Sequence, residues 1–200
     1  RAAAALGVPG VAAPSANRFG RVSPTTAAHV AHEFGPGLPV LDGGACREGI
    51  ESTIIDCTAE PPALLRPGTL HRRLLEQVLG QALRERDADS PRAPGSLESH
   101  YAPGAALHLA APTQLPAAVE AAVRESGPQR VGVYSRLMPG LVPGVVFQPM
   151  PDNAAQAAHE LFAALRQFDA CGVTQIWVET PPSGPEWDGV RDRLQRASVR

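Results

Sequence analysis

The stretch ALHLAAPTQLPAAVEAAVRESGPQRVGVYS, residues 106–135, decides the fold class of the C-terminal half of the chain. It contains a short apolar run at 106–109, a segment of helical character at 115–124 and a second short apolar run at 130–134. Short apolar runs are typical of buried strands, and strands that alternate with helices are typical of a parallel sheet with helices on its faces. The stretch therefore predicts a strand, a helix and a second, parallel strand.

The same alternation continues to the end of the chain. We expect two further strands at 145–150 and 175–179, and two further helices at 154–168 and 187–197. Residues 105–200 are therefore predicted to form a small parallel α/β domain, Rossmann-like in its layers, with about four strands.

The first part of the chain has shorter elements, separated by turns that are rich in Gly and Pro. The expected helices are 26–34 and 70–84, and the expected strands are 8–12, 38–41, 52–57 and 63–66. Residues 88–104 combine charged residues, Ser, Pro and Gly without periodicity, which is typical of a linker. We therefore divide the chain into an N-terminal domain at 1–87, a linker at 88–104 and a C-terminal domain at 105–200.

The composition argues against several classes of protein. The net charge of −2 is the opposite of the basic excess that general nucleic-acid binding requires, so no stable nucleic-acid partner is expected. No apolar run approaches the roughly 20 residues that a membrane-spanning helix needs, so no membrane association is expected. The cysteines have no C-x-x-C spacing, which argues against a zinc site or a disulfide framework and favours a cytoplasmic location.

The loop APSANRFGRVSPTT, residues 13–26, places several hydroxyl groups and one amide in front of a predicted helix. Backbone N–H groups at a helix N-terminus attract anions, and the hydroxyls of Ser15 and Ser23 add donors for phosphate oxygens. The alternative is a plain capped turn, in which Ser23 or Thr25 serves as the N-cap.

Two further places carry candidate ligand groups. The glycine-rich segment 43–53 offers the hydroxyl of Ser52, which suits a small polar substrate such as an amino acid; a simple hairpin is the alternative. Arg66 precedes a Pro-Gly turn, where a guanidinium can meet a phosphate, although an arginine at such a turn is usually solvated.

The linker contains two adjacent rings, His100 and Tyr101, in an otherwise polar segment. Rings in such a place are expected to dock onto a neighbouring domain or a bound ligand. A purely structural anchor is the alternative.

Other polar pairs do not resemble catalytic sites. His29 and His32 lack the Cys or carboxylate partners that a metal site needs. Glu48 and Glu51 flank a glycine and are expected to be solvated rather than to form an acid–base pair. The sequence contains no P-loop, GxGxxG or GxSxG motif.

Four runs of the sequence, taken in order, resemble the signature segments of the YrdC/TsaC-type threonylcarbamoyl-AMP synthases. They are PSANRFGRVSPTTAAHV (14–30), LDGGACREGIESTIID (41–56), LLRPGTL (64–70) and APGSLESHYAP (93–103). The last run and the α/β segment after it resemble the longer form of the family. The resemblance covers essentially the whole chain. It implies an α/β fold in which the C-terminal half of a YrdC-like mixed-sheet domain precedes a small parallel domain.

The resemblance also implies a reaction. The family joins L-threonine, bicarbonate and ATP, accompanied by Mg²⁺, into threonylcarbamoyl-AMP and pyrophosphate, and a downstream threonylcarbamoyltransferase then modifies tRNA. The matched motifs imply ATP-binding roles for Ser15, Ser23, Arg66 and Tyr101, threonine-binding roles for Ala13 and Ser52, and further contacts from Asn17 and His100. No covalent nucleophile and no metal ligand from the protein is implied, because the catalysis consists mainly of positioning and charge neutralisation.

One departure from the family pattern is that this chain contains no lysine, whereas the family carries a Lys/Arg motif in an N-terminal segment. We therefore expect the sequence to be an incomplete chain that makes little threonylcarbamoyl-AMP by itself. We also expect the C-terminal domain to dock weakly and to carry no catalytic group. Two other functions stay open: a non-catalytic nucleotide- or RNA-binding module with a YrdC-like fold, and a related carbamoyl-transfer enzyme.

Overall fold

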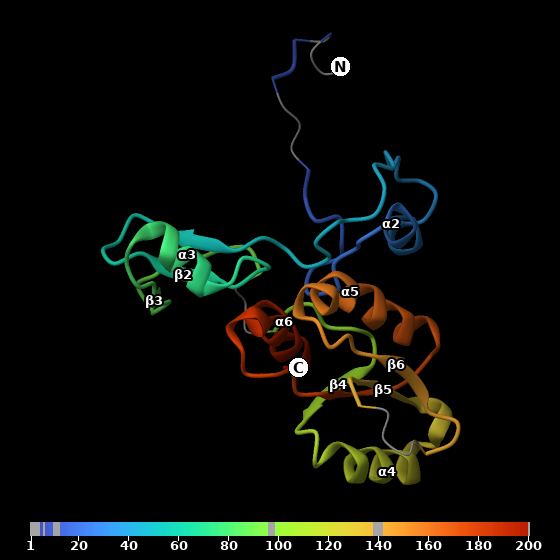
Figure 1. Ribbon diagram of the computed structural model, residues 1–200. Coiled ribbons are helices and arrows are strands. Elements are labelled where there is room, and N and C mark those ends of the chain that lie inside the picture. Colours follow the sequence, from blue (N-terminus) through green and yellow to red (C-terminus); the bar gives the residue numbers. More distant parts are fainter. Residues whose placement is uncertain (1–4, 6, 10–12, 96–98, 138–141, 200) are drawn as a thin grey trace.

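The computed structural model describes residues 5, 7–9, 13–95, 99–137 and 142–199. Figure 1 shows a large C-terminal unit and two smaller N-terminal parts that lie on opposite sides of the view. One N-terminal part carries helix α2 (Ala27–Phe34), and the other carries α3 (Arg72–Leu79) with a small sheet. The fold is therefore best described sheet by sheet.

The C-terminal unit is built on a parallel four-stranded sheet. Its strands are β4 (Ala106–Ala110), β5 (Val131–Ser135), β6 (Val146–Pro149) and β7 (Gln175–Glu179). They are hydrogen-bonded in the order β4-β7-β5-β6, and each neighbouring pair is parallel. The last strand thus lies between the first two, where Ile176 pairs with both Leu107 and Gly132. The expected parallel α/β unit is confirmed.

Helices cover both faces of this sheet. They are α4 (Leu115–Ser126), α5 (Ala154–Ala170) and α6 (Asp188–Ser198), with 3-10 turns at Pro128–Arg130 and Pro185–Trp187. On one face, Leu115 of α4 joins Val131 in a small apolar cluster. On the other, α5 and α6 bury Phe162 and Leu194 in the larger core. The side chain of Asn153 begins α5 by accepting hydrogen bonds from two amides of its first turn (2.9 and 3.1 Å).

The N-terminal half contributes a second, mixed sheet. Strand β1 (Ile54–Asp56) is antiparallel to β2 (Ala63–Arg66), and β3 (Arg84–Glu85) is parallel to β2. All residues of the central strand β2 are buried. The sheet therefore gives this half the mixed α/β character that was predicted.

Helix α2 begins at Ala27, one residue later than expected, and its cap differs from both expected caps. Its N-cap is Thr26, whose hydroxyl accepts a hydrogen bond from the amide of His29 (3.2 Å). Ser23 and Thr25 are both buried, and neither serves as the cap. The helix ends at Gly35.

Several expectations for the N-terminal half are wrong. Residues 38–41 form no strand, and Leu41 is 98% exposed. An apolar run becomes a strand only where a neighbour completes its backbone hydrogen bonds, and no described residue pairs with this run. The helix expected at 70–84 ends at Gly80, whose φ of 70° is the left-handed conformation that ends helices. The strand expected at 8–12 lies partly outside the described residues.

The described part of the linker is anchored at both sides. Ala102 forms a parallel bridge with Arg21, and its amide donates to the carbonyl of Gly20 (2.9 Å). The amide of Gly104 donates to both carboxylate oxygens of Asp169 on α5 (2.7 and 2.9 Å). The linker thus connects the loop before α2 to the C-terminal unit.

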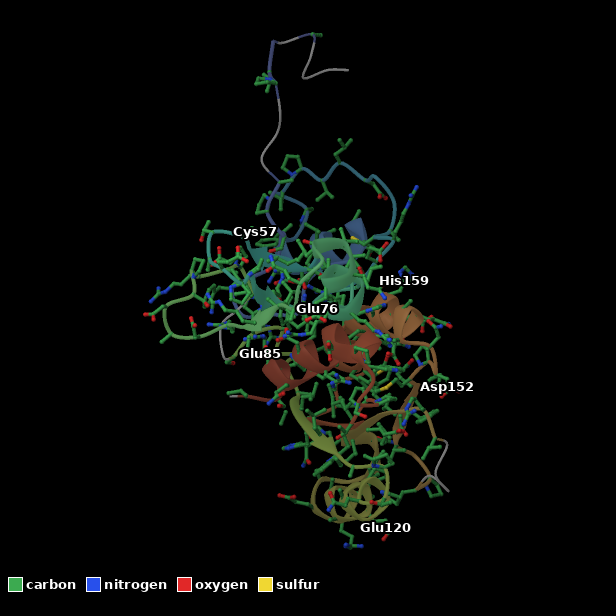
Figure 2. All side chains as sticks on the ribbon, turned by 60° about the vertical axis from the view of Figure 1, so that its left-hand side comes forward. Cys57, Glu76, Glu85, Glu120, Asp152 and His159 are labelled. Atoms are coloured by element: carbon green, nitrogen blue, oxygen red, sulfur yellow. The ribbon has the colours of Figure 1, made fainter. Side chains whose placement is uncertain are left out.

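The expectation that the C-terminal unit docks weakly is wrong. Val22, Ile50 and Tyr101 are buried in the same core as α5 and α6. A Cβ atom on Gly49 would lie only 2.3 Å from the carbonyl oxygen of His159, so the chain passes directly against α5. The ring of His159, labelled in Figure 2, lies 2.7 Å from the carbonyl oxygen of Arg47. These contacts join segments that are far apart in the sequence, and such contacts leave no local sequence pattern.

Candidate functional site

A buried polar cluster lies where the linker, the segment before β1 and helix α6 meet. Its central group is the carboxylate of Glu51, which accepts a hydrogen bond from the Ser23 hydroxyl (2.6 Å) and another from Nε of Arg193 (2.9 Å). Burial by itself raises the pKa of Glu51, but the charge of Arg193 and the hydrogen bond from Ser23 outweigh it and hold that pKa below its ordinary value. The expectation that Glu51 is solvated is therefore wrong.

Arg193 is the group that sequence reasoning missed. Its side chain has no exposed surface, although it sits on a helix of the C-terminal unit. Besides Glu51, its guanidinium contacts Asp192 (2.7 Å) and the carbonyl oxygen of Pro67 (2.8 Å), and it lies 5.1 Å from the ring centre of Tyr101. Because a buried cation needs partners, this network is a coherent unit rather than a chance contact.

Arg66 connects the segment before β1 to the linker. It is 6% exposed, and its Nε and Nη2 groups donate to the carbonyl oxygen of Ser52 (3.1 and 2.9 Å), while Nη1 donates to that of Pro94 (2.8 Å). A guanidinium has five N–H groups, so three bonds leave two for a ligand. The usual solvated state of an arginine at a turn does not apply here.

Tyr101 is a buried residue of the linker. Its ring stacks on Phe162 (centres 5.4 Å apart) and meets the edge of the His100 ring (4.1 Å). The residue is 1% exposed and has a positive φ of 61°, and no described residue bonds to its hydroxyl. Burial raises the pKa of this phenol. A buried phenol without a protein partner can donate to a ligand.

His100 is held beside it. Its amide donates to the carbonyl of Arg196 on α6 (3.2 Å). Burial, together with the positive charges of Arg196, Arg193 and Arg66, lowers the pKa of His100, and the nearby carboxylate of Glu51 opposes this only in part. This lowered pKa favours the neutral form of the ring.

The structure brings some of the predicted site residues together and leaves others apart. Ser23, Arg66, His100 and Tyr101 are linked through the cluster described above, and Ser52 joins it through its carbonyl while the residue as a whole is exposed. Among the described residues, no hydrogen bond joins the others to this cluster. These are Ala13 and Ser15, both exposed, and Asn17, whose amide donates to the carbonyls of Arg18 and Arg21 (3.0 and 3.1 Å).

A cavity of about 980 Å³ opens beside this cluster, and sequence reasoning did not find it. It lies between the loop before α2 and helix α5, and its lining includes Val22, His29, Glu33 and Arg166. Arg166 spans it by pairing with Glu33 (2.6 Å) and donating to the carbonyls of Val22 and Ser23. Arg166 therefore links α5 to α2 and to the loop before it, which gives this wall of the cavity a structural role.

Two classes of feature are absent from the described part of the chain. No helix there is both long and apolar enough to cross a membrane. No group of three or more His, Cys, Asp or Glu side chains gathers there in a way that could hold a metal ion.

Two family models match the chain. Residues 70–199 match one described as "Threonylcarbamoyl-AMP synthase, C-terminal domain", and residues 2–68 match one described as "Telomere recombination". The first match alone covers more than half of the chain.

Individual relatives agree with these matches. The threonylcarbamoyl-AMP synthase of Pyrococcus abyssi is 37% identical over 199 residues, covering 94% of this chain and 57% of that protein. A crystal structure of P. abyssi Sua5 complexed with L-threonine has a TM-score of 0.79 at 35% identity, covering 92% of this chain and 56% of the other. A structure of P. abyssi Sua5 with a histidine and the following tyrosine both replaced by alanine has a TM-score of 0.78 at 33% identity, with the same coverage.

The chain spans just over half the length of these relatives. Within that span the agreement extends across both sheets, since one family model ends and the other begins between β2 and α3. Because the C-terminal match covers more than half of the chain and the structural match covers nearly all of it, the chain belongs to the threonylcarbamoyl-AMP synthase family.

Proposed function

We propose that the chain is part of an enzyme that joins L-threonine, bicarbonate and ATP into threonylcarbamoyl-AMP and pyrophosphate. Family membership supports this, as does the similarity to a protein solved with L-threonine. The observation that carries the proposal is the clamp formed by Arg66, which fixes the carbonyls of Ser52 and Pro94. It joins two motifs that are far apart in sequence at one place, as a two-substrate site requires.

The threonine would bind to the segment before β1. Ser52 has an exposed side chain on a main chain that Arg66 holds through two hydrogen bonds (3.1 and 2.9 Å). A hydroxyl on a fixed main chain loses little conformational freedom when a substrate binds. Ala13, on the exposed loop before α2, would contribute a second contact to the same substrate.

The nucleotide would bind to groups that still have hydrogen-bonding capacity. Arg66 has two further N–H groups, Tyr101 has a hydroxyl without a described partner, and Ser15 has an exposed side chain. Asn17 and His100 are further candidates beside them. Ser23 differs, because its hydroxyl donates its hydrogen to Glu51 (2.6 Å), so its role would be to orient that carboxylate.

The adjacent rings of the linker support this assignment. This chain contains one His-Tyr pair, His100 and Tyr101. We take it as the counterpart of the His-Tyr pair that was replaced by alanine in the P. abyssi Sua5 variant. In this chain the pair contacts Arg193 and Phe162, so its rings are fixed beside the proposed nucleotide groups.

The chemistry needs no covalent intermediate on the protein. The threonine amine attacks the carbon of bicarbonate, and loss of water gives a carbamate. A carbamate oxygen then attacks the α-phosphorus of ATP, and pyrophosphate leaves. When bound, Mg²⁺ would neutralise phosphate charge, and we propose that the ATP phosphates hold it, since the described residues offer no cluster of metal ligands. The chain's own part is to position threonine and ATP and to supply the Arg66 charge.

The wider setting of the reaction follows from its product. We propose a cytoplasmic enzyme whose threonylcarbamoyl-AMP is consumed by a threonylcarbamoyltransferase that modifies tRNA. The net charge of −2 favours release of a small-molecule product over direct binding of tRNA.

The test is threonine-dependent release of pyrophosphate from ATP and bicarbonate. It compares this chain with the same chain joined to a lysine-containing N-terminal half from a relative. We expect turnover from the joined protein and almost none from the 200-residue chain, because losing even one preorganised donor costs about 10²–10³ in rate. Nucleotide binding by the joined protein without any response to threonine would instead indicate a non-catalytic binding module.

A further inference from the structure

We propose that Arg193 of α6 is a positioning residue that holds the Glu51–Ser52 segment and the Tyr101 ring in one arrangement. The inference deepens the proposed function, on which it rests: it makes the C-terminal unit responsible for aligning the threonine and nucleotide groups. Arg193 touches neither proposed substrate-binding hydroxyl, so it would act through Glu51 and Tyr101.

The geometry brings one guanidinium into contact with three residues outside its own helix. Nε donates to Glu51 (2.9 Å), Nη1 donates to the carbonyl of Pro67 (2.8 Å), and the guanidinium carbon lies 5.1 Å from the centre of the Tyr101 ring. The first two contacts fix the chain on either side of β1 and β2, and the third fixes the linker. One side chain thus contacts the Glu51–Ser52 segment, the residue that follows β2 and the linker.

The balance of buried charges explains why the ion pair between Arg193 and Glu51 matters for the arrangement. Arg193 is completely buried, and the carboxylates that face it are Glu51 and Asp192. Asp192 also forms an ion pair with Arg196, which lies one turn further along α6 (2.8 Å). Removing the Arg193 charge therefore leaves Glu51 with a hydrogen bond from Ser23 and no cation, in a place where burial disfavours its charge.

The chemistry of the side chain also fits. A planar guanidinium can donate along its edges while its face lies over an aromatic ring, whereas an ammonium group is a point charge. Helix α6 can approach closely enough because residue 189 is glycine: a Cβ atom there would lie 2.7 Å from Ile50 Cδ1 and 2.8 Å from the carbonyl oxygen of Gly68. The helix is therefore seated directly on the segments that Arg193 orders.

The first test is amide hydrogen exchange on the 200-residue chain with Arg193→Met. The reporters are the amides of Ile50, His100 and Ala102, which donate to Glu48, Arg196 and Gly20. We expect exchange at all three to rise by about 10²-fold, because breaking a buried ion pair from one side is costly. Amides of β5 and β7 should keep their protection.

Arg191→Met is the matched control. Arg191 lies on the same helix, but its hydrogen-bond partners among the described residues all belong to the C-terminal unit; they are Asp188 and the carbonyls of Pro182 and Gly184. This variant should leave the three reporter amides unchanged. Equal loosening by both variants, or loosening of only one of the two segments by Arg193→Met, would overturn the proposal.

A milder variant decides the question even if Arg193→Met does not fold. Glu51→Gln keeps the size of the side chain and removes its charge. We expect exchange at His100 and Ala102 to rise about five- to tenfold, since a neutral hydrogen bond holds Arg193 less firmly than a charged one. Glu51 itself has no hydrogen bond to the described part of the linker, so the effect would pass through Arg193. Unchanged linker exchange in this variant would refute coupling through Arg193.

Activity provides a readout that a general loss of stability would not move. In the joined protein described above, Arg193→Met should lower kcat/KM for threonine by about 10²-fold at temperatures where it stays folded, because small displacements of binding groups are costly. Arg193→Lys should recover part of this loss. If the unsubstituted protein shows no threonine-dependent turnover, the proposed function fails while the exchange data still decide the role of Arg193. Lower activity with unchanged exchange would refute the positioning role.

Discussion

Gly95 lies directly against the hydroxyl oxygen of Tyr101, so that a Cβ atom at position 95 would be 2.0 Å from it. Both residues have a positive φ, 73° for Gly95 and 61° for Tyr101. Position 95 therefore requires a residue without a side chain, because its backbone lies against a buried ring.

Replacing Gly95 by alanine is expected to destabilise the chain by more than backbone strain alone. An L-residue at positive φ costs about 1–2 kcal/mol, and the clash adds to this because Tyr101 is stacked on Phe162 and cannot withdraw. The measurement is the free energy of unfolding in urea. Gly172→Ala is the control, since Gly172 has a φ of 71° and open space around its Cβ position.

The double variant Gly95→Ala, Tyr101→Phe should recover the excess loss. Without the hydroxyl, the nearest atoms to the new Cβ are Nη1 of Arg66 at 3.1 Å and Cζ of Tyr101 at 3.2 Å, both tight but tolerable contacts. If Gly95→Ala and Gly172→Ala lower the free energy of unfolding by the same amount, the contact with Tyr101 does not contribute to the loss.

The ion pair between Glu33 of α2 and Arg166 of α5 should be a main fastening of the N-terminal part. The two side chains are only 9% and 14% exposed, and their charged atoms are 2.6 Å apart. We expect Arg166→Met to cost about 3 kcal/mol, because it removes the ion-pair partner of a mostly buried carboxylate, which then retains the hydrogen bond from the Arg18 amide (2.6 Å). Arg124→Met on α4 removes an ion pair of 71% and 59% exposed side chains and should cost less than about 1 kcal/mol. Similar unfolding midpoints for both variants would contradict this ranking.

Acid should weaken the contact between the segment before β1 and helix α6, because it protonates Glu51. Burial raises its pKa, but the Arg193 charge and the Ser23 hydrogen bond lower it more, so the native pKa lies below the ordinary value of 4.5. A carboxyl with a lowered native pKa contributes stability that is fully present above 4.5 and is lost as the pH falls through the native value.

Glu51→Gln should therefore flatten the pH dependence of the unfolding free energy in this acid window. Part of the slope should persist, because the pKa values of Glu33 and Glu179 are also held low, against the effect of burial, by hydrogen bonds and arginine charges. Glu120→Gln, at an exposed position on α4, is the control and should keep the parent profile. An identical slope for Glu51→Gln and the parent would show that this carboxyl does not report docking.

The parallel sheet could be predicted because its signal is local. Strands buried on both faces are short, continuous apolar runs, and α5 carries its buried residues Leu161, Leu165 and Phe168 at helical spacing. Those patterns depend on little beyond the chain segment itself, and β7 was predicted with its observed bounds at 175–179.

The errors share a cause that lies outside any local pattern. The run at 38–41 is as apolar as a strand, yet it needs a pairing partner, and partners are a property of the fold. Glu51 looked solvated because its partner Arg193 is 142 positions away. The same holds for the site. Its motifs indicated Arg66 and Tyr101, whereas Arg193, which contacts Glu51, Pro67 and the Tyr101 ring, sits on a helix with an ordinary polar pattern.

The two serines of the site should separate binding from stability. Ser52 is exposed, and the hydrogen bonds from Arg66 go to its main-chain carbonyl, which an alanine would keep. Ser52→Ala should therefore leave the unfolding free energy within about 0.5 kcal/mol of the parent. If the hydroxyl binds threonine as we propose, the same variant in the joined protein should raise KM for threonine about tenfold or more, the cost of one hydrogen bond to a charged or polar substrate. Ser23 is 5% exposed and donates to Glu51, so Ser23→Ala should cost about 1–3 kcal/mol of stability by leaving that carboxylate short of a donor. Urea unfolding and steady-state kinetics on both variants give the comparison. A stability loss in Ser52→Ala without a change in KM would remove Ser52 from the threonine site and assign it a purely structural role.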